Sequence, residues 1–208
     1  MESLDKNRIY EFEGLISSKL IESIHKKVFL SSVYYPSLFT VLPNDCPPGT
    51  DHLPIVDSLQ FVSTMVNKVI EKDQHKMDAE ELNFRNNIEF LSPLINVLSE
   101  LGIGFFLDGL ARVKTNIIPI NEKNYGTIHV PHVDLKDEEN CWTMIYFVNG
   151  NNGKTHFLKK DEDGKFNIYK SITPKQGKCV FFHSSNFHCG SVQNDKQYRA
   201  VINYNYMI

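Results

Sequence analysis

The chain has 208 residues, of which 41% are hydrophobic and 23% charged, which is ordinary for a globular protein and enough for one domain with a buried core. Its formal net charge is −3 and its pI is about 6.2, so it lacks the basic footprint of a protein whose main partner is nucleic acid. No apolar run approaches the roughly 20 residues that span a bilayer, so we expect no transmembrane segment and no membrane partner.

The N-terminal stretch and the cysteines indicate a cytoplasmic protein. The sequence MESLDKNRIYEFEGL is charged and lacks the apolar core of a signal peptide, so we expect no secretion. Four scattered cysteines form no CxxC pair and are expected to be reduced thiols: Cys46, Cys141, Cys179 and Cys189. The expected compartment is the cytoplasm of the producing or host cell, and the sequence leaves the oligomeric state open.

Three helices are expected in the first half of the chain. The first follows Ser17 and Ser18, which can cap a segment with apolar residues at helical spacing. A similar spacing predicts a second helix from about Ile55 to Lys72. A third begins at Ser92-Pro93, where proline suits the first helical turn, and ends before Gly102.

Residues 33–52 are rich in proline and turn formers, so they are expected to form a long exposed loop between the first two helices. After Gly104 the pattern changes to short strand-like runs separated by turn signals. These runs are 112–118, 127–133, 141–148, 155–158, 166–169, 178–183 and 198–207. Seven short strands in about 100 residues favour a sandwich or barrel. We therefore expect one domain over 1–208, with a mainly helical support region (1–102) packed outside a β-core (103–208).

The sequence HVPHVDLK (129–136) is the first candidate site. Side chains alternate along a strand, so His132 and Asp134 face the same way, with Cα atoms about 6.6 Å apart at a rise of ~3.3 Å per residue. His129 would then point to the opposite side. The expectation is that His132 and Asp134 act as a pair of metal ligands, although one His-x-Asp triplet is weak evidence by itself.

Two later residues strengthen this interpretation. His188 follows the strand KCVFFH, and Arg199 lies eleven residues further on, at the start of the last strand. Two histidines and one carboxylate form the facial triad that holds Fe(II) and leaves three coordination positions open. A buried arginine beyond the second histidine offers a two-pronged donor for a carboxylate.

In this order the motifs resemble those of the Fe(II)/2-oxoglutarate-dependent oxygenases, and within them the prolyl 4-hydroxylase-like group, which includes small phage-encoded members. The motifs are His132-x-Asp134, NGNNGKTHF, PKQGKCVFF, His188 and Arg199. The resemblance covers about residues 110–208 and implies a mainly β, α+β fold. Its core would be a double-stranded β-helix (a jelly-roll, cupin-like fold) with N-terminal supporting helices. The family's usual Gly-Gly-x-Thr stands here as residues 152–155, with asparagine in place of the first glycine.

The resemblance also implies roles for individual residues. His132, Asp134 and His188 would be the iron ligands and the catalytic centre. Arg199 would bind the distal carboxylate of the cosubstrate 2-oxoglutarate. Asn203 stands where relatives often carry a cosubstrate-contacting threonine, so it would donate a hydrogen bond.

The remaining pocket residues follow from strand alternation and from the resemblance. Thr143, Ile145 and Phe147 share a face of the strand 141–148 and are expected to line the cosubstrate pocket. In prolyl hydroxylases a cosubstrate-binding tyrosine is expected where Phe147 stands. Its contact must be lost or replaced, with Asn116 and Tyr125 as the candidate replacements.

The implied function is a dioxygenase that uses Fe(II), 2-oxoglutarate and O2 to hydroxylate an aliphatic carbon. Prolyl residues in a peptide are the first expectation, by resemblance alone, and a free amino acid or other small metabolite is the second. Two other functions stay open on the same scaffold. One is oxidative dealkylation of nucleobases, which the acidic pI disfavours, and the other is a cupin-like module that binds without catalysis.

Rival metal sites are weaker. His129 and His183 are expected to be structural or to support the ligands, and His183 is the main competitor of His188 for the distal position. Cys179, His183, His188 and Cys189 could suggest zinc and a hydrolase. Their spacing matches no common zinc module, and a strand would point several of these side chains apart.

Overall fold

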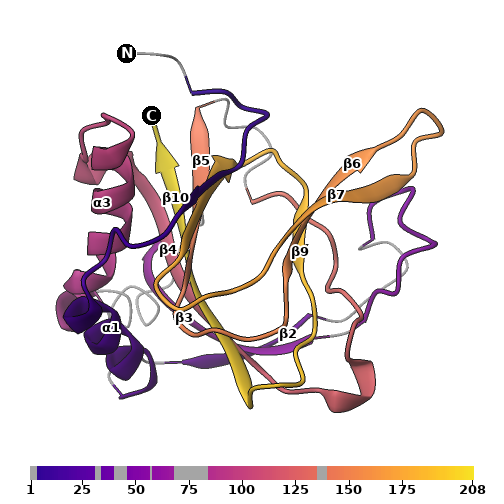
Figure 1. Cartoon of the computed structure of the whole chain (residues 1–208), viewed down its shortest axis with the longest axis horizontal. Helices are drawn as coiled ribbons and strands as arrows, with labels where there is room; N and C mark the ends of the chain where they lie inside the picture. The colour runs from indigo at the N-terminus through magenta and orange to yellow at the C-terminus, as the bar shows by residue number, and fades with distance from the viewer. Residues whose placement is uncertain (1–3, 31–33, 40–45, 57, 68–83, 135–139) are drawn as a thin grey trace.

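The computed structural model describes residues 4–30, 34–39, 46–56, 58–67, 84–134 and 140–208. Two antiparallel sheets face each other in the centre of the molecule (Figure 1). The larger has seven strands in the order β1-β8-β5-β10-β4-β3-β2, and the smaller has three in the order β7-β6-β9. The strands of the larger sheet are β1 (Tyr10–Phe12), β2 (Tyr35–Phe39), β3 (Ser58–Asn67), β4 (Leu110–Pro119), β5 (Cys141–Phe147), β8 (Cys179–His183) and β10 (Tyr198–Met207). Those of the smaller sheet are β6 (Thr155–Lys160), β7 (Phe166–Ile172) and β9 (His188–Gly190).

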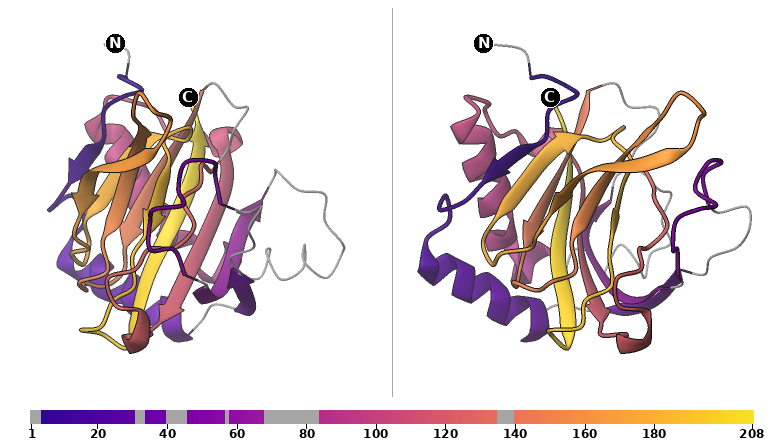
Figure 2. Two further views of the ribbon diagram at one scale, coloured as in Figure 1. Left: turned by 90° about the vertical axis from the view of Figure 1, so that its right-hand side faces the viewer. Right: turned by 45° about the vertical axis from the view of Figure 1, so that its right-hand side comes forward.

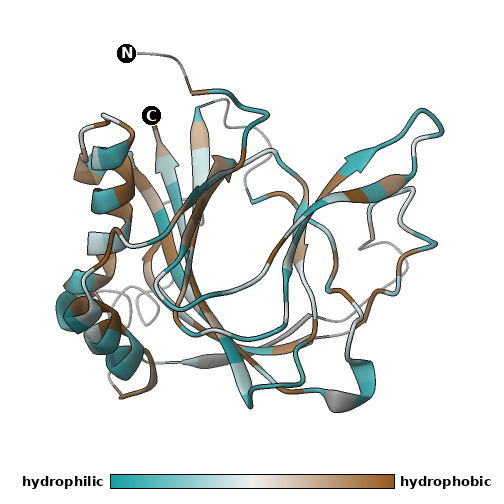
Figure 3. Cartoon of the chain, in the orientation of Figure 1, coloured by the Kyte–Doolittle hydropathy of each residue, from teal (hydrophilic) through white to brown (hydrophobic). Residues whose placement is uncertain are grey.

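Two α-helices cover the outer face of the larger sheet: α1 (Ser18–Leu30) and α3 (Ser92–Glu100) (Figure 2). Their apolar sides turn toward the strands and their polar sides outward (Figure 3). Buried Ile24 of α1 and Leu94 of α3 share one core cluster with Met144 of β5 and Phe181 of β8. Three short 3-10 turns complete the described elements: Ile88–Leu91, Leu107–Gly109 and Glu122–Asn124. No helix within the described residues is both long and apolar enough to cross a membrane.

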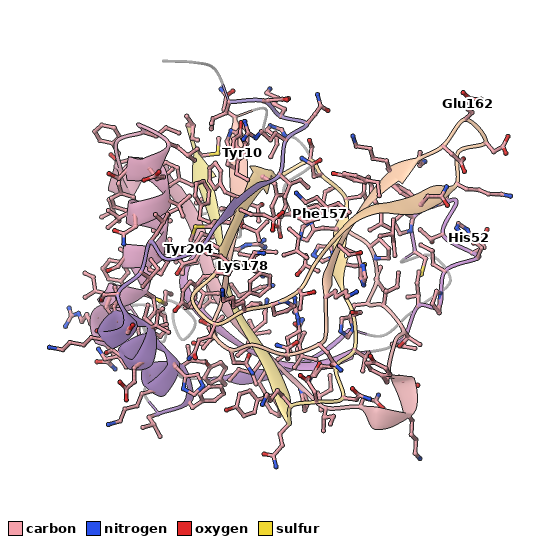
Figure 4. The ribbon with its side chains drawn as sticks, viewed as in Figure 1. Tyr10, His52, Phe157, Glu162, Lys178 and Tyr204 are labelled. Atoms are coloured by element: carbon pink, nitrogen blue, oxygen red, sulfur yellow. The ribbon has the colours of Figure 1, made fainter. Side chains whose placement is uncertain are left out.

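The central strands of the larger sheet are buried on both faces, and every residue of β5 is buried. Alternate side chains therefore serve two different cores. In Figure 4, Tyr204 of β10 lies on the helix side, where its hydroxyl donates to the backbone oxygen of Phe90. Phe157 of β6 lies on the inner side, in a second apolar cluster between the sheets that also contains Phe147. Glu162 marks the far tip of the β6–β7 hairpin.

The first and third predicted helices are confirmed. The Ser17 hydroxyl accepts a hydrogen bond from the backbone N–H of Leu20 at 3.4 Å, which caps α1. In α3, Pro93 occupies the first turn, and the chain leaves the helix through Gly102 at a positive φ of 72°.

The helix predicted at 55–72 is wrong over its described part, because residues 58–67 form strand β3. β3 pairs with both β2 and β4, and its register with β4 shifts between Thr64 and Val66. Leu59 and Val62 both precede this bulge and, three positions apart in a strand, lie on opposite faces of β3, so the helix-like spacing does not correspond to one buried face. Residues 57 and 68–72 lie outside the described part of the chain.

Two other expectations about local structure are corrected. The predicted exposed loop 33–52 contains strand β2, while its residues 33 and 40–45 are not among those described. The predicted strand 127–133 is an extended segment held only by isolated bridges at Ile128 and His132. Pro131 has no N–H, so a continuous ladder cannot form through it. The other six predicted strands are present, and β1 and β9 were not predicted.

Candidate metal centre

The two candidate histidines meet as a backbone pair. His132 N–H donates to the His188 carbonyl at 3.0 Å, and His188 N–H donates to the His132 carbonyl at 2.9 Å. This antiparallel bridge joins the extended segment before β5 to the edge strand β9. The two imidazole rings consequently lie side by side, with centroids 4.7 Å apart.

The hydrogen bonds of both rings fix the same tautomer. Nδ1 of His132 lies 3.0 Å from the carbonyl oxygen of Val130, and Nδ1 of His188 lies 3.0 Å from that of Asn186. A carbonyl oxygen only accepts, so each Nδ1 carries a proton, and in the neutral form of each ring Nε2 is the nitrogen with the lone pair. Loss of bulk water around the ring, together with the nearby His188, lowers the pKa of His132 to about 4, so this ring is neutral at pH 7.

Asp134 completes a three-ligand cluster. Its Oδ2 lies 3.7 Å from Nε2 of His188, and one ligand atom from each of Asp134, His132 and His188 lies within 4.8 Å of the others. Metal–ligand bonds of about 2.1 Å at right angles separate neighbouring donors by roughly 3 Å, so small side-chain rotations would close the set on an ion. Two neutral imidazoles and one carboxylate are the donors preferred by non-haem Fe(II).

A polar network holds the Asp134 carboxylate from behind. Nη2 of Arg112 donates to Oδ1 at 2.7 Å, and the Thr143 hydroxyl donates to Oδ2 at 2.9 Å. Asn205 ties the two supports together, since its Oδ1 accepts from Nε of Arg112 and its Nδ2 donates to the Thr143 hydroxyl. Burial alone would raise the pKa of Asp134, but His188, the second histidine and Arg112 hold it well below its usual range. The carboxylate is therefore ionised.

The triad opens into a cavity between the two sheets, and Arg199 lies in its wall. The guanidinium is 4% exposed and donates to the Gly153 carbonyl at 3.3 Å and to the Thr155 hydroxyl at 3.0 Å. No carboxylate among the described residues pairs with it. Burial lowers its pKa only to about 10, so Arg199 is a buried cation facing a cavity without a counter-charge.

The departure from the family's double glycine has a structural explanation. A Cβ on Gly153 would lie 2.7 Å from the Ser191 carbonyl oxygen, so this glycine is required for the close approach of the segment that contains Ser191. Asn152, by contrast, is half-exposed and exchanges hydrogen bonds with Asn194. Position 152, where the family's first glycine is replaced by asparagine, therefore has room for a side chain.

Other polar groups in the cavity wall lack partners. Oδ1 of Asn116, Oδ1 of Asn203 and both ring nitrogens of His129 are buried without a hydrogen bond in the described structure. Lys114 also lines this wall. Buried polar groups of globular proteins are normally satisfied, so four such atoms around one cavity indicate a polar ligand.

The other expected pocket residues are divided between the cavity and its surroundings. Ile145 lines the cavity. Thr143 instead supports Asp134, and Phe147 belongs to the apolar cluster between the sheets rather than to the cavity wall. Tyr125 is 51% exposed and is not among the residues around the cavity.

The rival histidine does not join the cluster. His183 bonds Ser185 through Nδ1 at 2.7 Å and meets Trp142 edge to face. Within the described residues, His132, Asp134 and His188 are the one group of three potential ligands that come this close. The Cys179/His183/His188/Cys189 set forms no zinc site there.

Sequence reasoning missed two charged side chains around the site, Arg112 and Lys114, and gave His129 only a structural or ligand-supporting role. A signal existed for the first two. Arg112, Lys114 and Asn116 alternate along β4, and three polar residues on one face of a strand indicate a polar interior. His129 was placed on the side away from the ligands by strand alternation, which fails here because the segment around Pro131 is not a regular strand.

Comparison with protein families adds independent support. Residues 120–207 match the family model described as the 2OG-Fe(II) oxygenase superfamily. The matched segment contains His132, Asp134, His188 and Arg199. No curated protein matches the chain.

Several solved structures share the fold. An oxidoreductase of the 2OG-Fe(II) oxygenase family from Burkholderia pseudomallei is 11% identical, with a TM-score of 0.55 over 96% of this chain and 84% of that one. A prolyl hydroxylase from Trichoplax adhaerens, in complex with a peptide of hypoxia inducible factor, is 14% identical, with a TM-score of 0.50 over 96% and 83%. The α-ketoglutarate-dependent epimerase SnoN is 10% identical, with a TM-score of 0.55 over 96% and 78%. These likenesses confirm the double-stranded β-helix fold.

Proposed function

We propose that the chain is a member of the 2OG-Fe(II) oxygenase superfamily, whose model matches residues 120–207, and that its reaction is hydroxylation of an aliphatic carbon. As a 2-oxoglutarate-dependent oxygenase the enzyme uses Fe(II), 2-oxoglutarate and O2. One observation carries the proposal: a two-histidine, one-carboxylate cluster and a buried guanidinium without a counter-charge share one cavity. The first would hold the metal and the second the cosubstrate.

In this proposal His132, Asp134 and His188 bind Fe(II) through Nε2, a carboxylate oxygen and Nε2. When bound, Fe(II) with 2-oxoglutarate and O2 supplies the oxidising power that inserts oxygen into an unactivated C–H bond, while 2-oxoglutarate becomes succinate and CO2. The chain contributes ligand geometry. The carbonyls of Val130 and Asn186 hold each Nδ1 proton, so that both imidazoles present their lone pairs to the same point.

Arg199 binds the distal carboxylate of 2-oxoglutarate with its free guanidinium edge. The argument is electrostatic: a buried cation is costly unless an anion accompanies it, and the carboxylate of the cosubstrate provides one. Asn203, four residues after Arg199 on the same face of β10, and Asn116 of β4 add hydrogen bonds to the cosubstrate from the same cavity wall. Ile145 and Val201 supply apolar contact that keeps water away.

Phe147 stands where prolyl hydroxylases are expected to carry a cosubstrate-binding tyrosine, and His129 supplies the hydrogen bond that this tyrosine would make. A Cβ built on Gly190 would lie 3.2 Å from Cδ2 of His129 and 3.3 Å from Nη1 of Arg199. The ring and the guanidinium therefore flank one side-chain-free position, and both ring nitrogens lack partners. A neutral imidazole there donates one N–H to the carboxylate that Arg199 holds.

The substrate is a prolyl residue of a peptide or a small molecule such as a free amino acid. We also propose that residues 1–208 form one domain, because β1, β2 and β3 from the first hundred residues complete the larger sheet. The surface near the cavity would then be built from both halves of the chain. Gln60 of β3, which lines the cavity, supports this.

Anaerobic titration tests the metal and cosubstrate sites together. Fe(II) and 2-oxoglutarate added to metal-free protein should give the weak visible charge-transfer band of a chelated keto acid, and oxygen should then release succinate. The matched variants are His188→Ala, which should abolish the band, and His183→Ala, which should keep it. Absence of the band in the wild-type protein, or its loss only in His183→Ala, would contradict the proposal.

A binding module without catalysis predicts a different result. Such a protein would bind the metal and a ligand, yet oxygen would yield no succinate above that of His188→Ala. Detection of a product heavier by one oxygen, formed together with succinate, would establish hydroxylation.

A further inference from the structure

Lys114 is the charged side chain of the cavity wall that the proposed reaction does not use. It lies on β4 in register with Asn203 of β10 and Thr64 of β3. The residue is half-buried and faces the same cavity as the triad. In the part of the chain that the structure describes, it forms neither a hydrogen bond nor an ion pair.

Among the residues that the structure describes, the neighbouring charges leave Lys114 without compensation. Arg112, two residues away, is paired with Asp134 at 2.7 Å, so these two charges cancel. The two carboxylates of 2-oxoglutarate are matched by the metal and by Arg199. Lys114 then remains as a further cation, close enough to Arg112 and Asp134 to interact with both.

This arrangement is unfavourable in the absence of a ligand. Burial and the like charge of Arg112 both weaken the ammonium form of Lys114, and only Asp134 favours it. A lysine ammonium bordering a metal centre is stabilised when an anion enters the cavity beside it. Asn116 and Asn203, which flank Lys114, are assigned to the cosubstrate above, so the ammonium of Lys114 is the group left for a second anion.

We propose that Lys114 binds a carboxylate of the substrate, so that the enzyme acts on a small carboxylic acid, such as a free amino acid, rather than on an internal prolyl residue. An internal prolyl residue carries no anion near the carbon that reacts, and it would leave the ammonium unpaired. This inference rests on the proposed function and selects between its two substrate classes.

Calorimetry on a non-reactive complex tests this inference. The protein is loaded with Mn(II) and N-oxalylglycine, an analogue of 2-oxoglutarate, and titrated with the common L-amino acids and with their amides. At least one acid should bind tenfold or more tightly than its amide, which lacks the carboxylate. Lys114→Met should reduce this preference to less than threefold, and Lys114→Arg should restore part of it.

Lys196→Met, which replaces an exposed lysine, is the matched control and should keep the full preference for the acid over its amide. Equal binding of every acid and amide by the wild-type complex would overturn the inference without using a variant. So would a Lys114→Met protein that loses N-oxalylglycine affinity while its acid preference stays intact, because Lys114 would then serve the cosubstrate. Failure of the wild-type protein to bind Mn(II) and N-oxalylglycine would instead refute the proposed function.

Discussion

The two faces of strand β10 show how differently one element can be built. Toward the helices, Ile202 and Tyr204 are fully buried in an apolar core. Toward the smaller sheet, Arg199, Asn203 and Asn205 present charge and amides to the cavity and its polar network. The helix-side face is satisfied by the protein itself, whereas the cavity face keeps groups that only a ligand can satisfy.

This contrast implies that the helix-side face mainly provides stability and the cavity face mainly provides ligand binding. Removing an apolar side chain from the helix side leaves a void and lowers the free energy of unfolding. Removing a buried charge from the cavity side relieves a desolvation cost and lowers ligand affinity instead. Four substitutions test whether the two faces are as independent as the structure indicates.

The largest expected effect is on the helix side. Phe181→Ala removes a fully buried ring that stacks on Trp142 at 5.2 Å, and it should cost about 3–5 kcal/mol of unfolding free energy. Chemical denaturation measures this cost. At a temperature where the variant is folded, its affinity for 2-oxoglutarate should be within twofold of wild type. A large loss of affinity would show that the two faces are coupled.

Arg199→Met should weaken 2-oxoglutarate binding by about 100-fold, or about 2.7 kcal/mol. The reason is loss of the guanidinium that we assign to the distal carboxylate. Binding of 2-oxovalerate, which has no distal carboxylate, should change little. The melting temperature should stay level or rise, because a buried unpaired cation is removed. Equal losses for both keto acids would disprove this role.

Arg112→Met should lower metal affinity by about 10–100-fold, as loss of the outer partner of a ligand commonly does. The hydrogen bond to Oδ1 of Asp134 disappears, and the carboxylate is less firmly oriented. Metal titration of the apo protein measures the effect. Arg112→Lys retains the charge but loses the hydrogen bond to Asn205, so its metal affinity should lie between those of the wild type and Arg112→Met. An unchanged metal affinity in Arg112→Met would exclude a positioning role.

The smallest effect is expected for His129→Phe, which keeps a ring but removes both nitrogens. Affinity for 2-oxoglutarate should fall about tenfold, in line with loss of one hydrogen bond to a charged group. Metal affinity should not change, since His129 is outside the three-ligand cluster. If 2-oxovalerate lost as much affinity as 2-oxoglutarate, His129 would not contact the distal carboxylate.

The grouping of the three candidate metal ligands was predictable from the sequence, because the motifs that contain them occur in the order that the family resemblance implies. His132, Asp134 and His188 do converge, but not through the regular strand that the alternation argument assumed. The carbonyls of Val130 and Asn186 and the bridge between the two histidines set the ring positions. The two carbonyl contacts are local, two residues before each histidine, but the bridge joins segments 56 positions apart, and no local pattern encodes it.

The fold was less predictable in the first half. The helix predicted at 55–72 fails over residues 58–67 because pairing of this segment with β2 and β4 overrides the helix-like spacing of its apolar residues. Arg112 and Lys114 were visible as polar residues of a strand, yet their direction depends on which face of β4 meets the cavity. That choice is made by the packing of α1 and α3 on the other face.

The paired amides of His132 and His188 have one more consequence. Each amide donates a hydrogen bond to the carbonyl of the other histidine, so the bridge that aligns the rings also joins two chain segments 56 positions apart. A metal ion bound by both imidazole rings would cross-link these two chain segments. Deuterium uptake at these two amides should therefore slow when the metal site is filled, so that hydrogen exchange reports metal occupancy without any substrate.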